Sequence, residues 1–118
     1  MAANAEGWER MIFALTIDQV LSGRKTCTTR RNEPLGIPGR TYAVQRGRGK
    51  KAEGRILIES IRYVERADDI DQATAEAEGF GSPGEFREVY AQLHGERTLE
   101  EGAWRIWFRL VKKERIKK

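Results

Sequence analysis

The stretch Gly23-Arg24-Lys25-Thr26-Cys27-Thr28-Thr29-Arg30-Arg31 collects cations and hydroxyls in nine consecutive positions. Before it, apolar residues recur at helical spacing from Ile17 to Leu21, and Thr16 with Gln19 has the form of a capping box, so a short helix is predicted there. The β-branched residues between Thr26 and Arg30 favour a strand. The stretch therefore places charged and reactive side chains where a helix gives way to a strand.

The order of the motifs resembles a known family. Gly23 to Arg30, preceded by a short apolar strand from Ile12 to Leu15, resembles the signature of the ASCH family. Ala75 to Phe80, followed by a helix that begins near Ser82, is similar to that family's middle, and the strand Trp104 to Leu110 is similar to its closing strand. The resemblance implies an α+β fold, a PUA-like mixed β-barrel of about five to six strands with two to three short helices packed at its side.

Length and composition limit the classes of protein. A chain of 118 residues is sufficient for one core, which predicts a single domain over residues 1–118 with flexible ends at 1–10 and 112–118. One cysteine and one histidine exclude an internal disulfide and argue against a metal site. No other cofactor is expected, because the sequence has neither a P-loop nor a Rossmann glycine fingerprint. The polar start and the lack of a long apolar run predict a soluble, cytoplasmic protein with no membrane partner.

Charge divides the chain into three parts. Residues 1–63 hold twelve Lys/Arg and six Asp/Glu. Residues 64–101 hold three Lys/Arg and eleven Asp/Glu, and residues 102–118 hold seven Lys/Arg and one Asp/Glu. An acidic, mostly helical middle is thus predicted between two basic, mostly strand-forming ends. This division is typical of a protein whose sheet meets phosphate, and it is also compatible with an ordinary solvated surface.

The remaining elements follow from apolar spacing and from turn residues. Strands are predicted at 11–15, lying inside the sheet, and at 40–45, 54–64 and 104–110. A helix capped by Asp68 or Asp69 should end at Gly79. A second helix should begin with the capping box from Ser82 to Glu85 and end at His94 and Gly95, with a buried stripe formed by Phe86, Val89, Tyr90 and Leu93.

Two basic features predict contacts with RNA or a nucleotide. The loop from Arg46 to Lys51 alternates cations with glycines and offers them no local partner, although a merely soluble turn would look the same. On the closing strand, alternation places Trp107 between Arg105 and Arg109 on the outer face, as in a base-stacking platform or in a structural cation-π pair. The predicted RNA- or nucleotide-binding residues are Arg24, Arg30, Arg46, Arg48, Lys50, Lys51, Arg105 and Trp107.

The resemblance also implies a candidate catalytic set. Some small ASCH members are amidohydrolases that remove the acetyl group from N4-acetylcytidine, with Lys, Thr and Glu at positions that match Lys25, Thr28 and Glu78. A threonine hydroxyl needs a base, and a lysine can serve if burial or neighbouring cations lower its pKa. Lys25 and Thr28 would lie on opposite faces of a straight strand, so they can converge only if Lys25 belongs to the preceding turn.

Three functions remain open on these grounds. The first, which the sequence favours, is a binding module that receives RNA or a modified nucleoside or nucleotide in a cleft between barrel and helices. The second is an N4-acetylcytidine amidohydrolase, and the third is a ribonuclease that uses the same cleft. A closed pocket of base size would favour the nucleoside enzyme, whereas an open groove continuous with the Arg48 loop would favour RNA.

Overall fold

The computed structural model describes residues 10–13, 16–34 and 36–113, and of Arg10 and Ile12 only the backbone. The strands are β1 (Arg10–Ile12), β2 (Cys27–Arg30), β3 (Thr41–Gln45), β4 (Ala52–Val64) and β5 (Ala103–Lys113). The helices are α2 (Ile17–Leu21), α3 (Gln72–Ala77) and α4 (Pro83–His94), followed by the 3₁₀ turn η1 (Glu96–Glu100). The α+β class is therefore confirmed.

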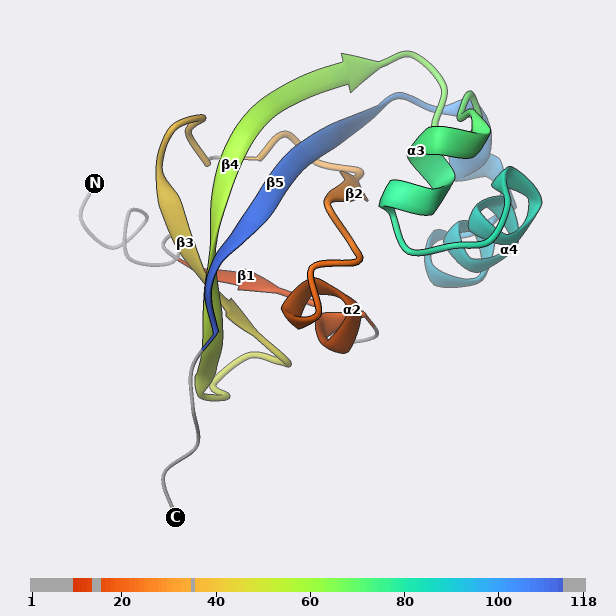
Figure 1. Cartoon of the computed structure of the whole chain (residues 1–118). Coiled ribbons are helices and arrows are strands. Elements are labelled where there is room, and N and C mark those ends of the chain that lie inside the picture. The colour runs from red at the N-terminus through yellow and green to blue at the C-terminus, as the bar shows by residue number, and fades with distance from the viewer. Residues whose placement is uncertain (1–9, 14–15, 35, 114–118) are drawn as a thin grey trace.

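The five described strands form one sheet in the order β1-β3-β4-β5-β2. The pairing is antiparallel except between β1 and β3, which run parallel. The long strands β4 and β5 form a curved centre (Figure 1), and the register shifts between Arg55 and Ile56 and again between Ile58 and Ser60. Within the described residues β1 and β2 are the two edges, so closure into a barrel is not seen. The first strand is an edge strand, contrary to the prediction that it lies inside the sheet.

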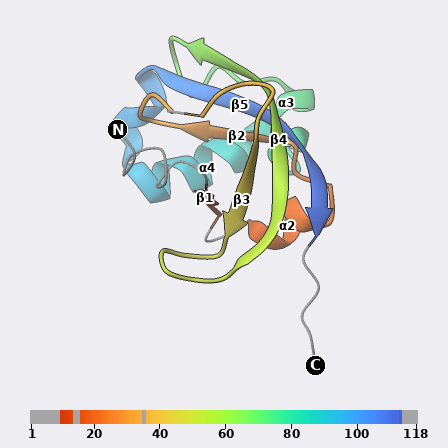
Figure 2. The same ribbon diagram turned by 90° about the vertical axis from the view of Figure 1, so that its left-hand side faces the viewer.

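The larger core lies between the sheet and α2, which sits beside the lower ends of β3, β4 and β5 in Figure 2. Ile17 and Val20 of α2 are fully buried against apolar side chains of β3, β4 and β5. Thr16 precedes the helix as predicted, but its side chain makes no capping hydrogen bond. The buried members of this core are Met11, Phe13, Ile17, Val20, Tyr42, Val44, Ile56, Ile58, Ile106 and Phe108.

A second core is built by α3, α4 and the adjoining end of the sheet, beyond the ends of β4 and β5 in Figure 1. Phe86 and Tyr90 of α4 stack with ring centroids 5.3 Å apart. The predicted cap of α4 is confirmed, since the Ser82 hydroxyl accepts a hydrogen bond from the Glu85 amide at 3.1 Å. The stripe ends earlier than predicted, because Leu93 is 57% exposed.

The cap of α3 differs from the prediction. Asp71, and not Asp68 or Asp69, accepts a hydrogen bond from the Thr74 amide at 2.8 Å. The aspartates before it belong to a turn, in which Asp68 pairs with Arg66. Three acidic residues close together made the start of the helix ambiguous by sequence.

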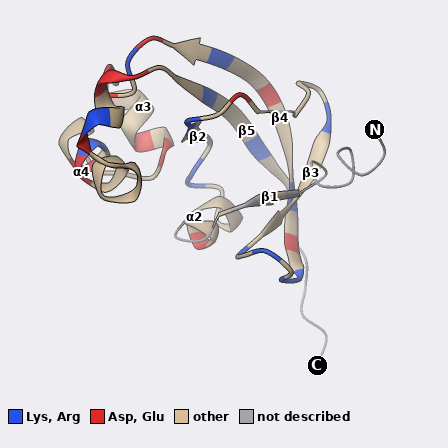
Figure 3. Ribbon diagram, turned by 180° about the vertical axis from the view of Figure 1, so that it is seen from behind, with Lys and Arg blue, Asp and Glu red and all other residues tan. Residues whose placement is uncertain are grey.

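Charge is distributed as the sequence predicts. Figure 3 shows acidic positions gathered on the side of α3 and α4 and basic positions along the sheet and its loops. Arg10 lies in β1, and residues 112–113 lie in β5, paired with Arg55 and Gly54. The rest of the two ends that we expected to be flexible, 1–9 and 114–118, falls outside the described residues. No helix in the described part of the chain is long and apolar enough to cross a membrane.

Candidate active site

The turn between α2 and β2 holds Lys25 in place. Gly23 has a φ of 82°, a left-handed conformation that suits glycine, and the amides of Arg24 and Lys25 both donate to the Gln19 carbonyl at 3.0 Å. Strand β2 begins only at Cys27. Lys25 therefore belongs to the turn, which removes the conflict with Thr28 that strand alternation would impose.

The end of α3 presents Glu78 to the same turn. Glu78 is the residue just after the helix, and its amide donates to the Thr74 carbonyl at 2.9 Å. Gly79 then turns the chain with a φ of 97° and packs so tightly that an added Cβ would lie 1.8 Å from the Gln19 side-chain oxygen. The Thr26 amide donates to the Ala77 carbonyl at 2.7 Å and joins the two segments. These backbone contacts fix Glu78 beside β2.

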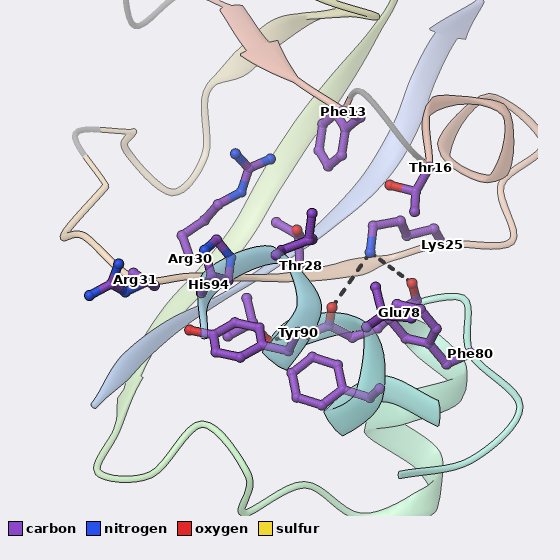
Figure 4. A pocket seen from close by; sticks show the side chains of 14 residues that line it. Phe13, Thr16, Lys25, Thr28, Arg30, Arg31, Glu78, Phe80, Tyr90 and His94 are labelled. Carbon is purple, nitrogen blue, oxygen red and sulfur yellow. Dashed lines mark hydrogen bonds and ion pairs between the residues drawn. The ribbon is translucent and has the colours of Figure 1, made fainter. Parts of the chain in front are cut away.

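Lys25 and Glu78 form a buried pair (Figure 4). The Lys25 amine donates to the backbone carbonyl of Glu78 at 2.7 Å and lies 3.5 Å from its Oε1, and each side chain is 3% exposed. The pKa of Lys25 lies below its ordinary value of 10.5 because burial disfavours the ammonium form, although Glu78 partly opposes this shift. Burial thus gives an amine that loses its proton more readily than an exposed lysine does.

Thr29 and Arg105 hold the other carboxylate oxygen. The Thr29 hydroxyl donates to Oε2 of Glu78 and accepts from Nη1 of Arg105 at 2.8 Å. The Arg105 guanidinium is 3.9 Å from the same carboxylate oxygen and also donates to the carbonyls of Ala67 and Asp69 at 3.2 and 2.7 Å. The Glu78 side chain is therefore restrained from both sides.

Cys27 lies on the same face of β2 as Thr29 but is a poor nucleophile. Its sulfur is 3.8 Å from Oε2 of Glu78 and is fully buried. Burial and, to a smaller extent, the Glu78 charge raise the pKa of the thiol far above its ordinary value. Since the thiolate is the reactive form, Cys27 serves as a small core residue.

Thr28 and the Lys25–Glu78 pair line one pocket of about 250 Å³. The Thr28 hydroxyl makes no hydrogen bond with any described residue, so it is available to a ligand. Much of the remaining wall is aromatic: Phe86 and Tyr90 belong to α4, whereas Phe13 follows β1 and Phe80 follows α3. The other residues that line the pocket are Phe13, Thr16, Thr29, Arg30, Arg31, Phe80, Phe86, Val89, Tyr90, Leu93 and His94.

The predicted nucleotide contacts divide into two groups. Arg30 lines the pocket, and its guanidinium lies 5.1 Å from the Phe13 ring centroid. Arg24, Arg48, Lys50 and Lys51 are exposed and do not line it. Trp107 is half-buried on β5, beside Cys27 of β2. For the residues outside the pocket, contact with RNA stays a prediction.

Two of these predictions are wrong in their structural basis. Arg46 is not a cation without local partners, because its guanidinium lies 3.1 Å from carboxylate oxygens of both Asp18 and Glu53. Arg105 is not on an outer face, because it is 4% exposed and binds Thr29. The segment between β4 and α3 covers Arg105, which donates to the carbonyls of Ala67 and Asp69, and simple alternation does not foresee such covering.

Sequence reasoning missed Thr29 and the aromatic wall. The family resemblance pointed to Thr28 and not to its neighbour Thr29, although strand alternation could have placed Thr29 on the face opposite Thr28. Phe80 follows Glu78 closely, and its ring centroid is 5.8 Å from the Lys25 amine. Tyr90 was predicted as core alone, whereas it also faces the pocket.

In the described part of the chain no group of three or more His, Cys, Asp or Glu residues could hold a metal ion.

Solved structures match the fold. An ASCH domain from Lactobacillus crispatus is 17% identical, with a TM-score of 0.67, and the match covers 93% of this chain and 74% of that one. The ASCH protein from Zymomonas mobilis is 21% identical, with a TM-score of 0.59, and the match covers 86% and 67% of the two chains. The chain has the ASCH fold. A protein from Enterococcus faecalis is also similar, with 17% identity, a TM-score of 0.67, and coverage of 86% and 72%.

At these identities the likeness concerns the ASCH fold alone. The sequence matches no protein-family model, and no curated protein matches it. What the ASCH fold contributes here is a way of bringing the α2–β2 turn and the end of α3 together, although 53 positions separate Lys25 from Glu78. The chemistry must be argued from the pocket itself.

Proposed function

We propose that this protein binds a modified nucleoside in the pocket and hydrolyses an amide on its base, with N4-acetylcytidine as the model substrate. The observation that carries the proposal is the shared pocket of Lys25, Thr28 and Glu78, in which the amine is buried and its pKa is lowered. A base, a hydroxyl and a carboxylate around one cavity are the parts that covalent amide hydrolysis requires.

The shape of the pocket supports a small, flat substrate. Its volume of about 250 Å³ lies below the range of about 300–1,000 Å³ that drug-sized ligands occupy. Phe80, Phe86 and Tyr90 supply aromatic surface on which a base can stack. No residue of the loop from Arg46 to Lys51 lines the pocket, so an open groove for RNA running to that loop has no support.

The reaction can be written with every proton accounted for. Neutral Lys25 takes the proton of the Thr28 hydroxyl as the oxygen attacks the acetyl carbonyl carbon. The bond from that carbon to the exocyclic nitrogen then breaks, and the amine leaves with the proton that Lys25 returns. Water next attacks the Thr28 ester and gives one proton to Lys25, which passes it to the departing Thr28 oxygen. The acetyl group leaves as acetic acid, which releases the second proton of the water to solvent and becomes acetate. Glu78 orients the Lys25 amine throughout.

Turnover tests the proposal directly. Incubation of the protein with N4-acetylcytidine should give cytidine and acetate in equal amounts, measured by chromatography. The exposed Arg40 does not line the pocket, so Arg40→Gln provides a control variant that should keep the wild-type rate. An absence of product at high enzyme concentration, with the protein shown to be folded, would refute the proposal.

The pH dependence gives a second expectation. Because only the neutral amine acts as base, kcat/KM should rise with pH through the pKa of Lys25, with a midpoint below 10.5. The rising limb should disappear in Lys25→Met, whose residual rate should not follow the same titration. A rate that falls over this range would contradict the role of Lys25 as a base.

A further inference from the structure

The pocket has a second polar end that the proposed reaction does not use. Arg30, Arg31 and His94 all line it, and Figure 4 shows them grouped on the side away from Lys25 and Phe80. Arg30 ends β2, Arg31 follows it, and His94 ends α4. Two elements far apart in the sequence therefore supply one basic group.

The three side chains influence one another. The pKa of His94 lies below its ordinary value of 6.5, first because burial disfavours the imidazolium form and then because Arg31 and Arg30 repel its charge. The His94 ring contacts the Tyr90 ring at a centroid distance of 4.6 Å, which holds the imidazole at the pocket wall. An anion placed here would offset the mutual repulsion.

The acids nearby leave room for such an anion. Arg31 lies 3.6 Å from Glu101, but both side chains are about half exposed, at 47% and 56%, and an exposed pair of this kind contributes little. Glu78 is occupied by Lys25 and Thr29 deeper in the pocket. A ligand oxyanion can therefore replace the weak contact of Arg31 at small cost.

We propose that Arg30, Arg31 and His94 form a phosphate subsite, so that the substrate of the pocket is a phosphorylated nucleoside. This inference rests on the proposed function, because the proposed reaction places the nucleobase at the Lys25 end of the pocket. Guanidinium groups bind phosphate through charge-assisted, often paired hydrogen bonds, and a histidine can donate a further one. The phosphate is that of a mononucleotide or of a short RNA end, which share this chemistry.

Binding measurements on the full chain test the subsite without reference to turnover. Calorimetric titration would compare cytidine with its 5′-monophosphate, its 3′-monophosphate and a cytidine dinucleotide. At least one phosphorylated ligand should bind about 10- to 100-fold more tightly than cytidine. Arg31→Gln and His94→Gln should each reduce this preference, whereas Arg40→Gln should retain it.

Each outcome has a distinct meaning. A preference for the dinucleotide over both monophosphates would support the subsite and identify an RNA end as the source of the phosphate. Equal affinity of cytidine and all phosphorylated ligands would overturn the subsite while leaving amide hydrolysis intact. A phosphate preference that persists unchanged in both variants would also overturn it. A lack of acetate release would instead refute the proposed function, whatever the binding preference.

Discussion

Replacing Thr28 with valine should lower turnover of N4-acetylcytidine by about 10³-fold or more without unfolding the protein. Valine removes the proposed nucleophile and retains the branched shape that suits a strand. Thr28 is 7% exposed, and its hydroxyl makes no hydrogen bond with the described residues, so little stability should be lost. Steady-state kinetics and the melting temperature measure the two effects separately.

Thr28→Ser is the matched control for that change. Serine keeps a hydroxyl at the same position, so a substantial part of the activity should remain. If Thr28→Val were as active as the wild type, the hydroxyl would have no chemical role. The pocket would then be one for binding, or another group in it would attack the substrate.

Replacing Arg105 with methionine should cost about 3 kcal/mol of unfolding free energy. Arg105 is 4% exposed, and its loss leaves the carbonyls of Ala67 and Asp69 without their side-chain donor and Glu78 with one cation fewer. The methionine is nearly as long but cannot donate hydrogen bonds. Urea denaturation of the wild type and the variant, with equal m-values, would measure the difference.

Arg62 offers a control on the neighbouring strand. It lies directly opposite Arg105 in the β4–β5 register, but it is exposed. Arg62→Met should therefore change stability by no more than about 0.5 kcal/mol. Equal stabilities for the Arg105 and Arg62 variants would show that the buried hydrogen bonds of Arg105 are not important for folding.

Local signals in the sequence predicted many of the elements. The helix from Ile17 to Leu21, the cap at Ser82 and the long strands could be read from spacing and capping residues. The order of the strands in the sheet could not be predicted in this way, because long-range pairing alone makes β1 and β2 the edge strands. The start of α3 was also missed, since Asp68, Asp69 and Asp71 are equivalent as caps until the backbone is known.

The candidate site was predictable only through the family resemblance. That resemblance singled out Glu78 among eighteen acidic residues, and the fold places its carboxylate 3.5 Å from the Lys25 amine. Arg105 was predicted to face outward, because alternation along a strand does not indicate which segment covers each face. Arg46 was predicted to lack local partners, but Glu53, seven positions along the chain, pairs with it, and Asp18, 28 positions away in sequence, does so as well.

The central claim is that Thr28 attacks an acetyl group while Lys25 accepts its proton. Mass spectrometry of protein quenched rapidly after mixing with N4-acetylcytidine tests this most directly. We expect an acetyl group on the peptide that contains Thr28, absent in Thr28→Val and formed much more slowly in Lys25→Met. Steady acetate release by the Thr28→Val variant, or acetylation found only at another residue, would contradict it.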